Sequence, residues 1–341
     1  MPARVLLVGS GITSSLTSTF IKKKVKDSLY LEVWDKAKGV GGRMSTSRST
    51  TCISSKVDLG AQYITALPEE FLKNQELYES LLSSNVLEPL NANVEGMKLF
   101  PAGTKHFVAP NGMNSVVRHF LQYDEIKFEH HVTAISQHEN KVLVQTKGGD
   151  KDLFDAVILT MPVPQILEIT KGMPLHSELL NALKRVRYSS RYALGLFYDT
   201  PNTAFNVPWD AKYIDNCVFR FIAFDNRKRN RKYEPDACVF HTSVRYGYEN
   251  IDCSIEDMKE KLLDHVKQMF PTWPKPVHVK CQKWRYSQVI EPYLNKPGYV
   301  VLASSPLVLA GGDGFIESNF SGCLFSASKL AEVAVDMINS I

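Results

Sequence analysis

The sequence lacks the short motifs that mark several common classes of enzyme. Its six cysteines are scattered and form no Cys-x-x-Cys pair, so neither a zinc site nor a dithiol redox centre is indicated. It has no Gly-x-Ser-x-Gly and no His-Glu-x-x-His, which removes the simplest hydrolase and metalloprotease interpretations. We therefore expect buried free thiols and no metal site.

Long apolar runs and a strong charge of one sign are also missing. No stretch is apolar enough to cross a bilayer, so we expect a soluble protein without membrane insertion. A net charge of +4 over 341 residues gives no support for nucleic-acid binding. Two local basic runs, Lys22–Lys26 and Arg227–Lys232, are predicted to be the solvated end of the first helix and a surface loop. With 44% hydrophobic residues, the chain can bury a large core divided into two lobes.

A glycine motif near the N-terminus is the first positive signal. Gly9 and Gly11 follow Arg4–Val8, an apolar run of the kind found in buried parallel strands. The two glycines let the backbone turn tightly beneath a pyrophosphate, and the free amides of the next helix would face the phosphates. The third glycine of this fingerprint is replaced by Ser14, which is small enough for the helix to pack on the strand. Alone, such a turn is structural more often than it binds a nucleotide.

Two features that follow in the sequence strengthen this interpretation. Leu29–Asp35 is predicted to be the second strand, and Asp35 lies near the distance of about twenty residues expected for an acid that binds an adenosine ribose. A carboxylate there would repel a 2′-phosphate, so NADP is a poor candidate for this site. Gly41 and Gly42 then allow the backbone to approach a ligand, and Arg43 supplies a planar positive group for its diphosphate. Together these features indicate FAD.

Two further segments fit the flavin end of the same ligand. The glycine and alanine in Asp58–Tyr63 would let a flat ring lie against the chain, which makes Gln62 and Tyr63 candidates to touch the isoalloxazine. Pro306–Ala310 is another buried-strand run, and Asp313 follows it to accept from a ribityl hydroxyl. A last helix that starts near Ser321-Gly322 would direct its positive end at the flavin and favour negative charge on the reduced ring.

Several longer segments make the chain resemble the renalase family within the flavin amine oxidase superfamily. They extend over nearly the whole length and are more specific than a nucleotide fingerprint; they are Leu31–Thr46, Asp58–Thr65, Val157–Leu167, Tyr188–Asp199, Cys281–Val289 and Gly311–Ala327. The resemblance implies a Rossmann-like FAD-binding domain with a parallel sheet and a strand-rich substrate domain. This is the two-domain α/β architecture of flavin amine oxidases and p-hydroxybenzoate hydroxylase.

The expected cofactor is non-covalent FAD. The residues expected to bind it are Gly9, Gly11, Thr13, Asp35, Gly42, Arg43, Gln62, Tyr63, Val132, Asp313 and Phe320. For the chemical step we expect Tyr63 and Trp284 as aromatic walls and His241 as the polar group that faces them. Each of these three also has an ordinary structural explanation, because Trp and Tyr are mostly core residues and a strand histidine is usually satisfied within the fold.

The predicted flavin domain is discontinuous. It comprises residues 1–76, 105–168 and 281–341, and the substrate domain comprises 77–104 and 169–280. The latter contains apolar strand-like runs at Tyr192–Tyr198 and Cys238–Thr242, and a helix is predicted from about Ser254 to Phe270. We expect the substrate to bind between the two lobes.

Three functions remain open from the sequence. The resemblance implies an oxidase that converts the misreduced 2- and 6-dihydro isomers of NAD(P)H to NAD(P)+, with hydride transfer to flavin N5 and reduction of O2 to H2O2. The first alternative is a catecholamine or amine oxidase, although no dedicated base is evident. The second is a secreted signalling ligand that binds a cell-surface receptor through an exposed basic stretch, Cys217–Lys232. The resemblance also implies secretion with the N-terminus retained; the alternative location is cytoplasmic.

Overall fold

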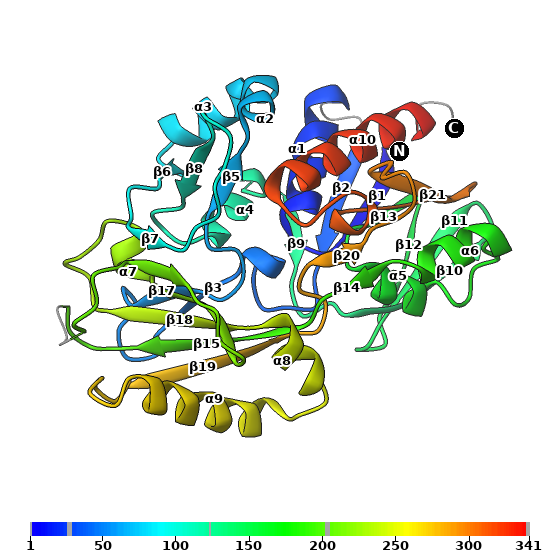
Figure 1. Cartoon of the computed structure of the whole chain (residues 1–341). Coiled ribbons are helices and arrows are strands. Elements are labelled where there is room, and N and C mark those ends of the chain that lie inside the picture. The colour runs from blue at the N-terminus through cyan, green and yellow to red at the C-terminus, as the bar shows by residue number, and fades with distance from the viewer. Residues whose placement is uncertain (1, 26–28, 123, 202–204, 339–341) are drawn as a thin grey trace. The chain divides into compact units, whose positions relative to one another are not determined.

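The computed structural model describes residues 2–25, 29–122, 124–201 and 205–338. The chain forms two compact units (Figure 1). Unit 1 consists of Met1–Gly42, Val117–Tyr188 and Gln288–Ile341, and unit 2 consists of Arg43–Val116 and Ser189–Ser287. Each unit combines strands with helices, as the predicted α/β class requires.

Unit 1 is built on a six-stranded sheet with the order β21-β22-β13-β1-β2-β9. All neighbouring strands are parallel except the edge strand β21, which runs antiparallel to β22. This confirms the predicted Rossmann-like sheet. The strands are β1 (Ala3–Val8), β2 (Leu29–Trp34), β9 (Glu125–Lys127), β13 (Ala156–Leu159), β21 (Tyr299–Ser304) and β22 (Leu307–Gly311).

Two helices, α1 (Ile12–Val25) and α10 (Phe320–Ile338), pack against each other in unit 1 (Figure 1). Ser14 is fully buried in α1, so a serine fits where the fingerprint has glycine. None of the helices in the described part of the chain has the length and apolarity that a membrane span needs. The remaining elements of this unit are β10 (Val132–His138), β11 (Lys141–Thr146), β12 (Lys151–Phe154), α5 (Val163–Ile169), α6 (Ser177–Lys184), β14 (Arg187–Tyr188), β20 (Val289–Glu291) and the 3-10 turn η2 (Asp313–Phe315).

Unit 2 is built on a second six-stranded sheet, with the order β19-β15-β18-β17-β16-β7. Its strands are antiparallel except for the pair β16 and β7. They are β7 (Val94–Glu95), β15 (Arg191–Phe197), β16 (Ala211–Tyr213), β17 (Phe219–Phe224), β18 (Ala237–Thr242) and β19 (His278–Trp284). The two predicted strand runs at Tyr192–Tyr198 and Cys238–Thr242 are therefore confirmed as β15 and β18.

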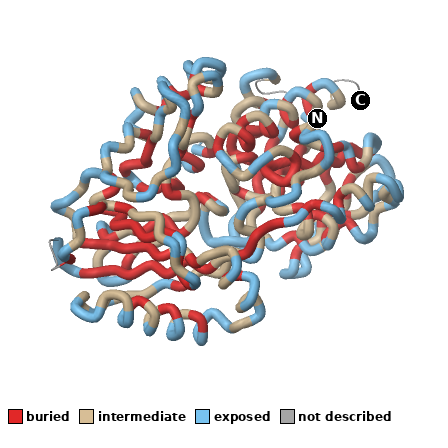
Figure 2. Tube along the Cα trace, viewed as in Figure 1, coloured by how far each residue is buried: buried red, intermediate tan, exposed pale blue. Residues whose placement is uncertain are grey.

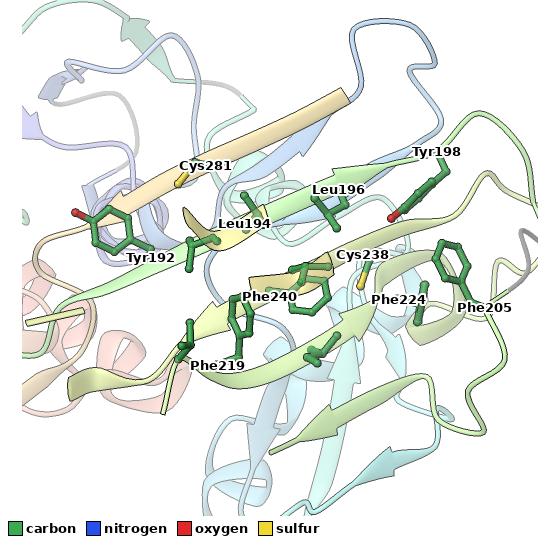
Figure 3. Packing of buried hydrophobic residues seen from close by; sticks show 14 of the residues in the cluster. Tyr192, Leu194, Leu196, Tyr198, Phe205, Phe219, Phe224, Cys238, Phe240 and Cys281 are labelled. Atoms are coloured by element: carbon green, nitrogen blue, oxygen red, sulfur yellow. The ribbon is translucent and has the colours of Figure 1, made fainter. Parts of the chain in front are cut away.

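One face of this second sheet is covered by helix α9 (Ile255–Met269), which begins after the N-cap Ser254 as predicted. Alternate strand residues such as Leu194 and Phe240, labelled in Figure 3, belong to an apolar cluster that also contains Met258 and Leu262 of the helix. Figure 2 shows the same sheet as a block of buried residues. On the opposite face, Val57 of β4 and Leu59 form a second apolar cluster with strand residues such as Ala193 and Phe221.

Small elements complete unit 2. Two of them, β4 (Lys56–Asp58) and α7 (Asp225–Lys228), pack against each other and against the sheet. The others are β3 (Thr46–Arg48), β5 (Ile64–Ala66), α2 (Pro68–Lys73), α3 (Gln75–Ser83), β6 (Glu88–Pro89), β8 (Lys105–Val108) and α8 (Val244–Glu249). The 3-10 turn η1 (Gly42–Met44) and helix α4 (Asn114–Phe120) cross from one unit to the other.

The compact units and the predicted domains differ at several boundaries. Residues 43–76, 105–116 and 281–287 were predicted to belong to the flavin domain, yet they cluster within unit 2. Residues 169–188 were assigned to the substrate domain and cluster within unit 1. The physical cause for the first group is strand packing: β4 lies on β15 and β18, and β19 pairs with β15. The compact units do not show which segments bind FAD and which bind substrate. The predicted division into a flavin domain and a substrate domain therefore stays a prediction.

Candidate functional site

The turn between β1 and α1 is shaped for a phosphate group. Gly9 has φ +103°, and a Cβ there would lie 3.0 Å from Oγ1 of Thr160, so only glycine fits without strain. At Gly11 a Cβ would meet no atom within 4 Å, which leaves open space beside the turn. The first intrahelical bond runs from Ser15 N–H to the Gly11 carbonyl, so the preceding amides at the start of α1 have no partner within the helix.

Asp35, at the end of β2, braces this turn. One carboxylate oxygen accepts from the backbone N–H of Ser10 at 2.6 Å and from its hydroxyl at 2.7 Å. The other accepts from the N–H of Ala37 at 2.7 Å. Asp35 therefore connects the end of the second strand to the phosphate turn, a role that the spacing did not predict. Its predicted contact with a ribose stays a prediction.

The second glycine motif packs directly on the first. The N–H of Gly41 donates to the carbonyl of Ser10 at 2.9 Å. Gly42 has φ +52°, and a Cβ on it would lie 3.5 Å from the Cα of Gly11. Gly41 also has a positive φ, +133°, so both Gly41 and Gly42 adopt backbone conformations that favour glycine. The two motifs thus form one continuous backbone surface, in the arrangement expected for a diphosphate cradle.

A third glycine motif, Gly311-Gly312-Asp313-Gly314, follows the strand run Pro306–Ala310 and lies near the start of α1. Gly312 has φ +115°, and a Cβ there would lie 3.3 Å from the Thr160 carbonyl and 3.8 Å from the hydroxyl of Thr13. Asp313 is buried and accepts from the hydroxyl of Ser318 at 2.5 Å. Three motifs far apart in the sequence therefore meet within unit 1.

Two other predicted cofactor residues lie at the ends of elements in unit 1. Phe320 is the first residue of α10, and it is buried; the last helix thus starts one residue before the predicted position. Val132 is also buried and opens β10, where its strand partner is Thr146. The structure describes no contact that joins Val132 to the three glycine motifs.

In unit 2, Arg43 and the Asp58–Tyr63 segment are joined through the backbone. The N–H of Ala61 donates to the Arg43 carbonyl at 2.8 Å, and the Arg43 guanidinium donates to the carbonyl of Ser287 at 3.2 Å. The bond to Ser287 holds the guanidinium of Arg43 in position. The predicted contact of Arg43 with a diphosphate stays a prediction.

The face of the unit 2 sheet that lies opposite α9 carries the residues expected to do chemistry. Strand register places Trp284 opposite Arg191, and His241 opposite both Ala193 and Phe221. The ring of Phe221 lies 5.8 Å from that of His241. Because side chains alternate along a strand, these residues share the face that α9 does not cover.

Trp284 and Tyr63 are both held in place by hydrogen bonds. The indole N–H of Trp284 donates to the carbonyl of Leu59 at 2.7 Å. The hydroxyl of Tyr63 lies 2.6 Å from that of Tyr213 on β16. Burial raises the pKa of both tyrosines, so both hydroxyls stay protonated at neutral pH. These contacts hold both aromatic side chains in place; their predicted role as walls of a substrate site stays a prediction.

His241 is neutral under physiological conditions. Its pKa is lowered to about 3, first because the ring is shielded from water and then because Arg191 and Lys228 are positively charged nearby. A hydrogen bond with the carbonyl of Leu59 opposes the shift only in part. His241 is therefore a very weak base, and its predicted place in the site stays a prediction.

One sequence prediction in this region is wrong. The basic run Arg227–Lys232 was expected to be a surface loop, but Lys228 and Arg229 are buried to 1% exposure. They form ion pairs with Asp58 and Asp225, two equally buried carboxylates. The spacing of Asp225 three and four positions before the two basic residues was the signal that could have indicated these pairs.

The same burial affects the stretch Cys217–Lys232, which was proposed as an exposed contact surface. Strand β17 and helix α7 lie within it, and most of their side chains are in the core, including Phe219, Ile222 and Phe224. Cys217 and Arg220 remain exposed. A continuous basic surface is therefore not present there, because the stretch supplies a central strand of the sheet.

Comparisons with known proteins show the family and the fold of this chain. Residues 74–293 match the family model described as flavin containing amine oxidoreductase, and residues 7–80 match the NAD(P)-binding Rossmann-like domain. Mouse renalase is 40% identical to this chain, over 97% of the chain and 98% of the mouse protein. A crystal structure described as a candidate protoporphyrinogen oxidase from Exiguobacterium sp. 255-15 superposes with a TM-score of 0.74 at 12% identity. It covers 98% of this chain and 99% of the bacterial one, and it shows a shared fold.

Proposed function

Because this chain belongs to the renalase family of flavin containing amine oxidoreductases, we propose that it oxidises misreduced dihydronicotinamide dinucleotides. The substrates would be the 2- and 6-dihydro isomers of NAD(P)H, and the products NAD(P)+ and hydrogen peroxide. The chain is a flavoprotein oxidoreductase by family; the substrate and the product peroxide are our proposal.

FAD is the form of the flavin that fits best, and we propose that it is bound without a covalent link. The support is the meeting of three glycine motifs in unit 1, where Gly11 borders open space and α1 presents unpaired amides. Asp35 adds a carboxylate at the end of β2, where a ribose would lie. When bound, FAD would supply the hydride acceptor and pass the electrons on to dioxygen.

The observation that carries the substrate proposal is the chemistry of the residues on the unit 2 sheet face opposite α9. Its walls are the aromatic side chains of Trp284, Tyr63 and Phe221, and its histidine is neutral with a pKa of about 3. A dihydronicotinamide that loses hydride becomes an aromatic cation, so its oxidation needs a flat slot and little acid or base catalysis. Oxidation of an amine would first require a base to remove a proton from the ammonium group, and His241 is too weak for that.

The chain's own groups would position the substrate rather than react with it. Trp284 is fixed by Leu59 and Tyr63 by Tyr213, so a planar ring would find preformed walls with little loss of side-chain entropy. The partly buried Arg191 guanidinium donates to the carbonyl of Thr242 at 3.3 Å at the same end of the sheet. Its positive charge suits an anionic dinucleotide.

The cofactor is tested first. We expect purified protein to be yellow and to release FAD on acid precipitation. A colourless folded protein, or flavin that stays with the pellet, would contradict a non-covalent FAD site.

Anaerobic stopped-flow spectroscopy then tests the substrate. We expect fast bleaching of the flavin by 2- and 6-dihydronicotinamide dinucleotides, much slower bleaching by ordinary 4-dihydro NADH, and peroxide when oxygen is admitted. If catecholamines bleached the flavin within seconds while the isomers left it oxidised, the amine oxidase alternative would replace our proposal.

A further inference from the structure

Two arginine side chains lie at the same end of the unit 2 sheet. Arg191 is the first residue of β15 and comes two residues before Ala193, which belongs to the apolar cluster on the face opposite α9. Because alternate residues of a strand share a face, Arg191 also lies on that face. Its guanidinium donates to the carbonyl of Thr242, the last residue of β18, at 3.3 Å. Arg191 is therefore placed where β18 ends.

Arg220 reaches the same end of the sheet through an irregularity in β17. Phe219 and Phe221 pair with consecutive residues of β18, so Arg220 between them has no residue opposite it. Such a bulge redirects side chains: Phe219 belongs to the cluster that faces α9 and Phe221 to the cluster on the other face, although residues two apart in a regular strand share a face. The Arg220 guanidinium lies 6.0 Å from the ring centroid of Tyr213, which packs against the same cluster as Phe221. Both arginines are thus on the face opposite α9.

Arg220 carries a positive charge that its described contacts do not balance. The side chain is exposed, and its guanidinium donates to the carbonyl of Ile214 at 2.9 Å. Among the described residues, its side-chain contacts are this carbonyl and the ring of Tyr213, and they include no carboxylate. A guanidinium has five N–H donors, so the bond to Ile214 leaves most of those of Arg220 for another acceptor.

The positive charges of the two arginines act on each other. Arg191 is half-buried, and two effects lower its pKa, first its burial and then the charge of Arg220. Tyr213 acts on that pKa in the opposite direction. Both arginines in turn act on Tyr213, where their charges oppose the rise in pKa that burial causes. Like charges held close together cost free energy, and an anion bound by both groups would offset that cost.

We infer that Arg191 and Arg220 together bind the diphosphate of the dinucleotide substrate. The inference rests on the proposed function, and it assigns a site to the part of that substrate which the aromatic residues do not bind. A planar guanidinium fork matches the oxygens of a phosphate group, and two forks match a diphosphate.

The location of the two arginines suits this role. In the ladder between β15 and β19, Arg191 lies directly opposite Trp284. The hydroxyl of Tyr213, over whose ring Arg220 lies, is 2.6 Å from that of Tyr63. Trp284 and Tyr63 are the residues that we propose to hold the nicotinamide ring. One dinucleotide could therefore place its ring and its diphosphate on neighbouring residues of unit 2.

The test compares ligands that differ by their phosphate groups. Isothermal titration of the oxidised, FAD-bound protein with nicotinamide riboside, nicotinamide mononucleotide and NAD+ measures affinity without turnover. We expect the wild type to bind the mononucleotide and NAD+ at least roughly tenfold more tightly than the riboside, the scale of a charged hydrogen bond.

Three variants complete the design. Arg220→Gln is the main one, because the position is exposed and the change should leave the fold intact. Arg191→Lys keeps a positive charge but loses the planar fork, so we expect a smaller loss of affinity. Lys212→Gln is the matched control, since it removes a positive charge from the same sheet. Alternation along β16 puts Lys212, next to Tyr213, on the other face, and it pairs with Glu95 at 2.7 Å.

We expect Arg220→Gln to bind the mononucleotide and NAD+ roughly tenfold more weakly than the wild type does, with an unchanged affinity for the riboside. Lys212→Gln should bind all three ligands as the wild type does. In stopped-flow experiments, Arg220→Gln should need a higher concentration of the 2- and 6-dihydro isomers for half-maximal flavin reduction, with little change in the limiting rate.

Two results would overturn the inference. One is a wild type that does not prefer the mononucleotide to the riboside, and the other is a folded Arg220→Gln that keeps this preference. If the isomers did not reduce the wild-type flavin, the proposed function would be wrong, and the titrations would still decide whether the two arginines bind phosphate.

Discussion

Gly60 lies against the backbone of Arg43 so closely that a methyl group on Gly60 would come 1.9 Å from the Arg43 carbonyl oxygen. The same oxygen accepts the N–H of Ala61 at 2.8 Å. The sequence suggested that the small residues here make room for a flat ring. In the structure Gly60 also has a second purpose, which is to let two predicted flavin-binding segments pack backbone to backbone.

Gly60→Ala should therefore damage the fold and flavin binding together. A Cβ at 1.9 Å from backbone cannot be relieved by turning a side chain, so we expect a loss of roughly 1 to 3 kcal/mol in the free energy of unfolding. Urea unfolding followed by circular dichroism measures it. Gly39→Ala is the control, because a Cβ at Gly39 meets no atom within 4 Å. Equal stability of the two variants would show that the Arg43 and Gly60 segments can separate at no cost.

Gly11→Ala should behave in the opposite way. The added methyl group enters open space in the protein, so we expect the stability of the flavin-free protein to change by less than about 1 kcal/mol. If a pyrophosphate occupies that space, FAD affinity should fall at least about tenfold, because the backbone can no longer approach it. Fluorescence titration with FAD measures the affinity. Unchanged binding would move the phosphates away from the β1–α1 turn.

Arg43→Ala tests the proposed diphosphate contact. Removing one charged hydrogen-bonding group costs roughly 1.5 to 3 kcal/mol, so FAD should bind one to two orders of magnitude more weakly. Arg43→Lys should restore only part of the affinity, because an ammonium lacks the planar fork. Arg48→Ala on the nearby strand β3 is the control, since Arg48 is not a predicted flavin contact. Normal FAD binding by Arg43→Ala would mean that Arg43 does not bind the diphosphate.

The pKa of His241 predicts a loss of stability in acid. Because the folded-state pKa is about 3 and an unfolded histidine titrates near 6.5, only the unfolded chain takes up this proton between those values. Stability therefore falls as pH decreases from about 6.5 toward 3, by up to about 2 kcal/mol between pH 7 and pH 5.

Urea unfolding at pH 7 and pH 5 measures the loss of stability in acid. We expect this loss to be smaller in His241→Asn than in the wild type, and the difference is the contribution of His241. His138→Asn, at an exposed position, is the matched control. An acid loss in His241→Asn as large as that of the wild type would mean that His241 is protonated in the folded protein.

The features that the sequence predicted well are local. Strands β1, β2 and β22 follow from short apolar runs, and α9 follows from Ser254 and the amphipathic pattern after it. The glycine motifs were recognisable because a left-handed or crowded backbone leaves few choices of residue.

The features that it missed depend on contacts between distant segments. Lys228 and Arg229 read as a solvated basic run until Asp58, about 170 positions earlier, is placed beside them. The neutrality of His241 likewise results from shielding and from the charges of Arg191 and Lys228, which no spacing along the chain reveals. The bracing of the phosphate turn by Asp35 was hidden because its partner Ser10 precedes it by 25 positions.

Trp284 gives the sharpest test of the proposed substrate. Its indole is fixed by the bond to Leu59 on the sheet face opposite α9, so we expect it to orient a planar donor. Trp284→Ala should slow anaerobic flavin reduction by the 2- and 6-dihydronicotinamide isomers by roughly ten- to a hundredfold, because a small loss of alignment is costly for hydride transfer. FAD should remain bound. Trp284→Phe keeps an aromatic ring but loses the hydrogen bond to Leu59, so we expect an intermediate rate of flavin reduction. An unchanged rate in Trp284→Ala would show that Trp284 is not part of the substrate site. The dihydronicotinamide proposal would then lack its principal aromatic wall.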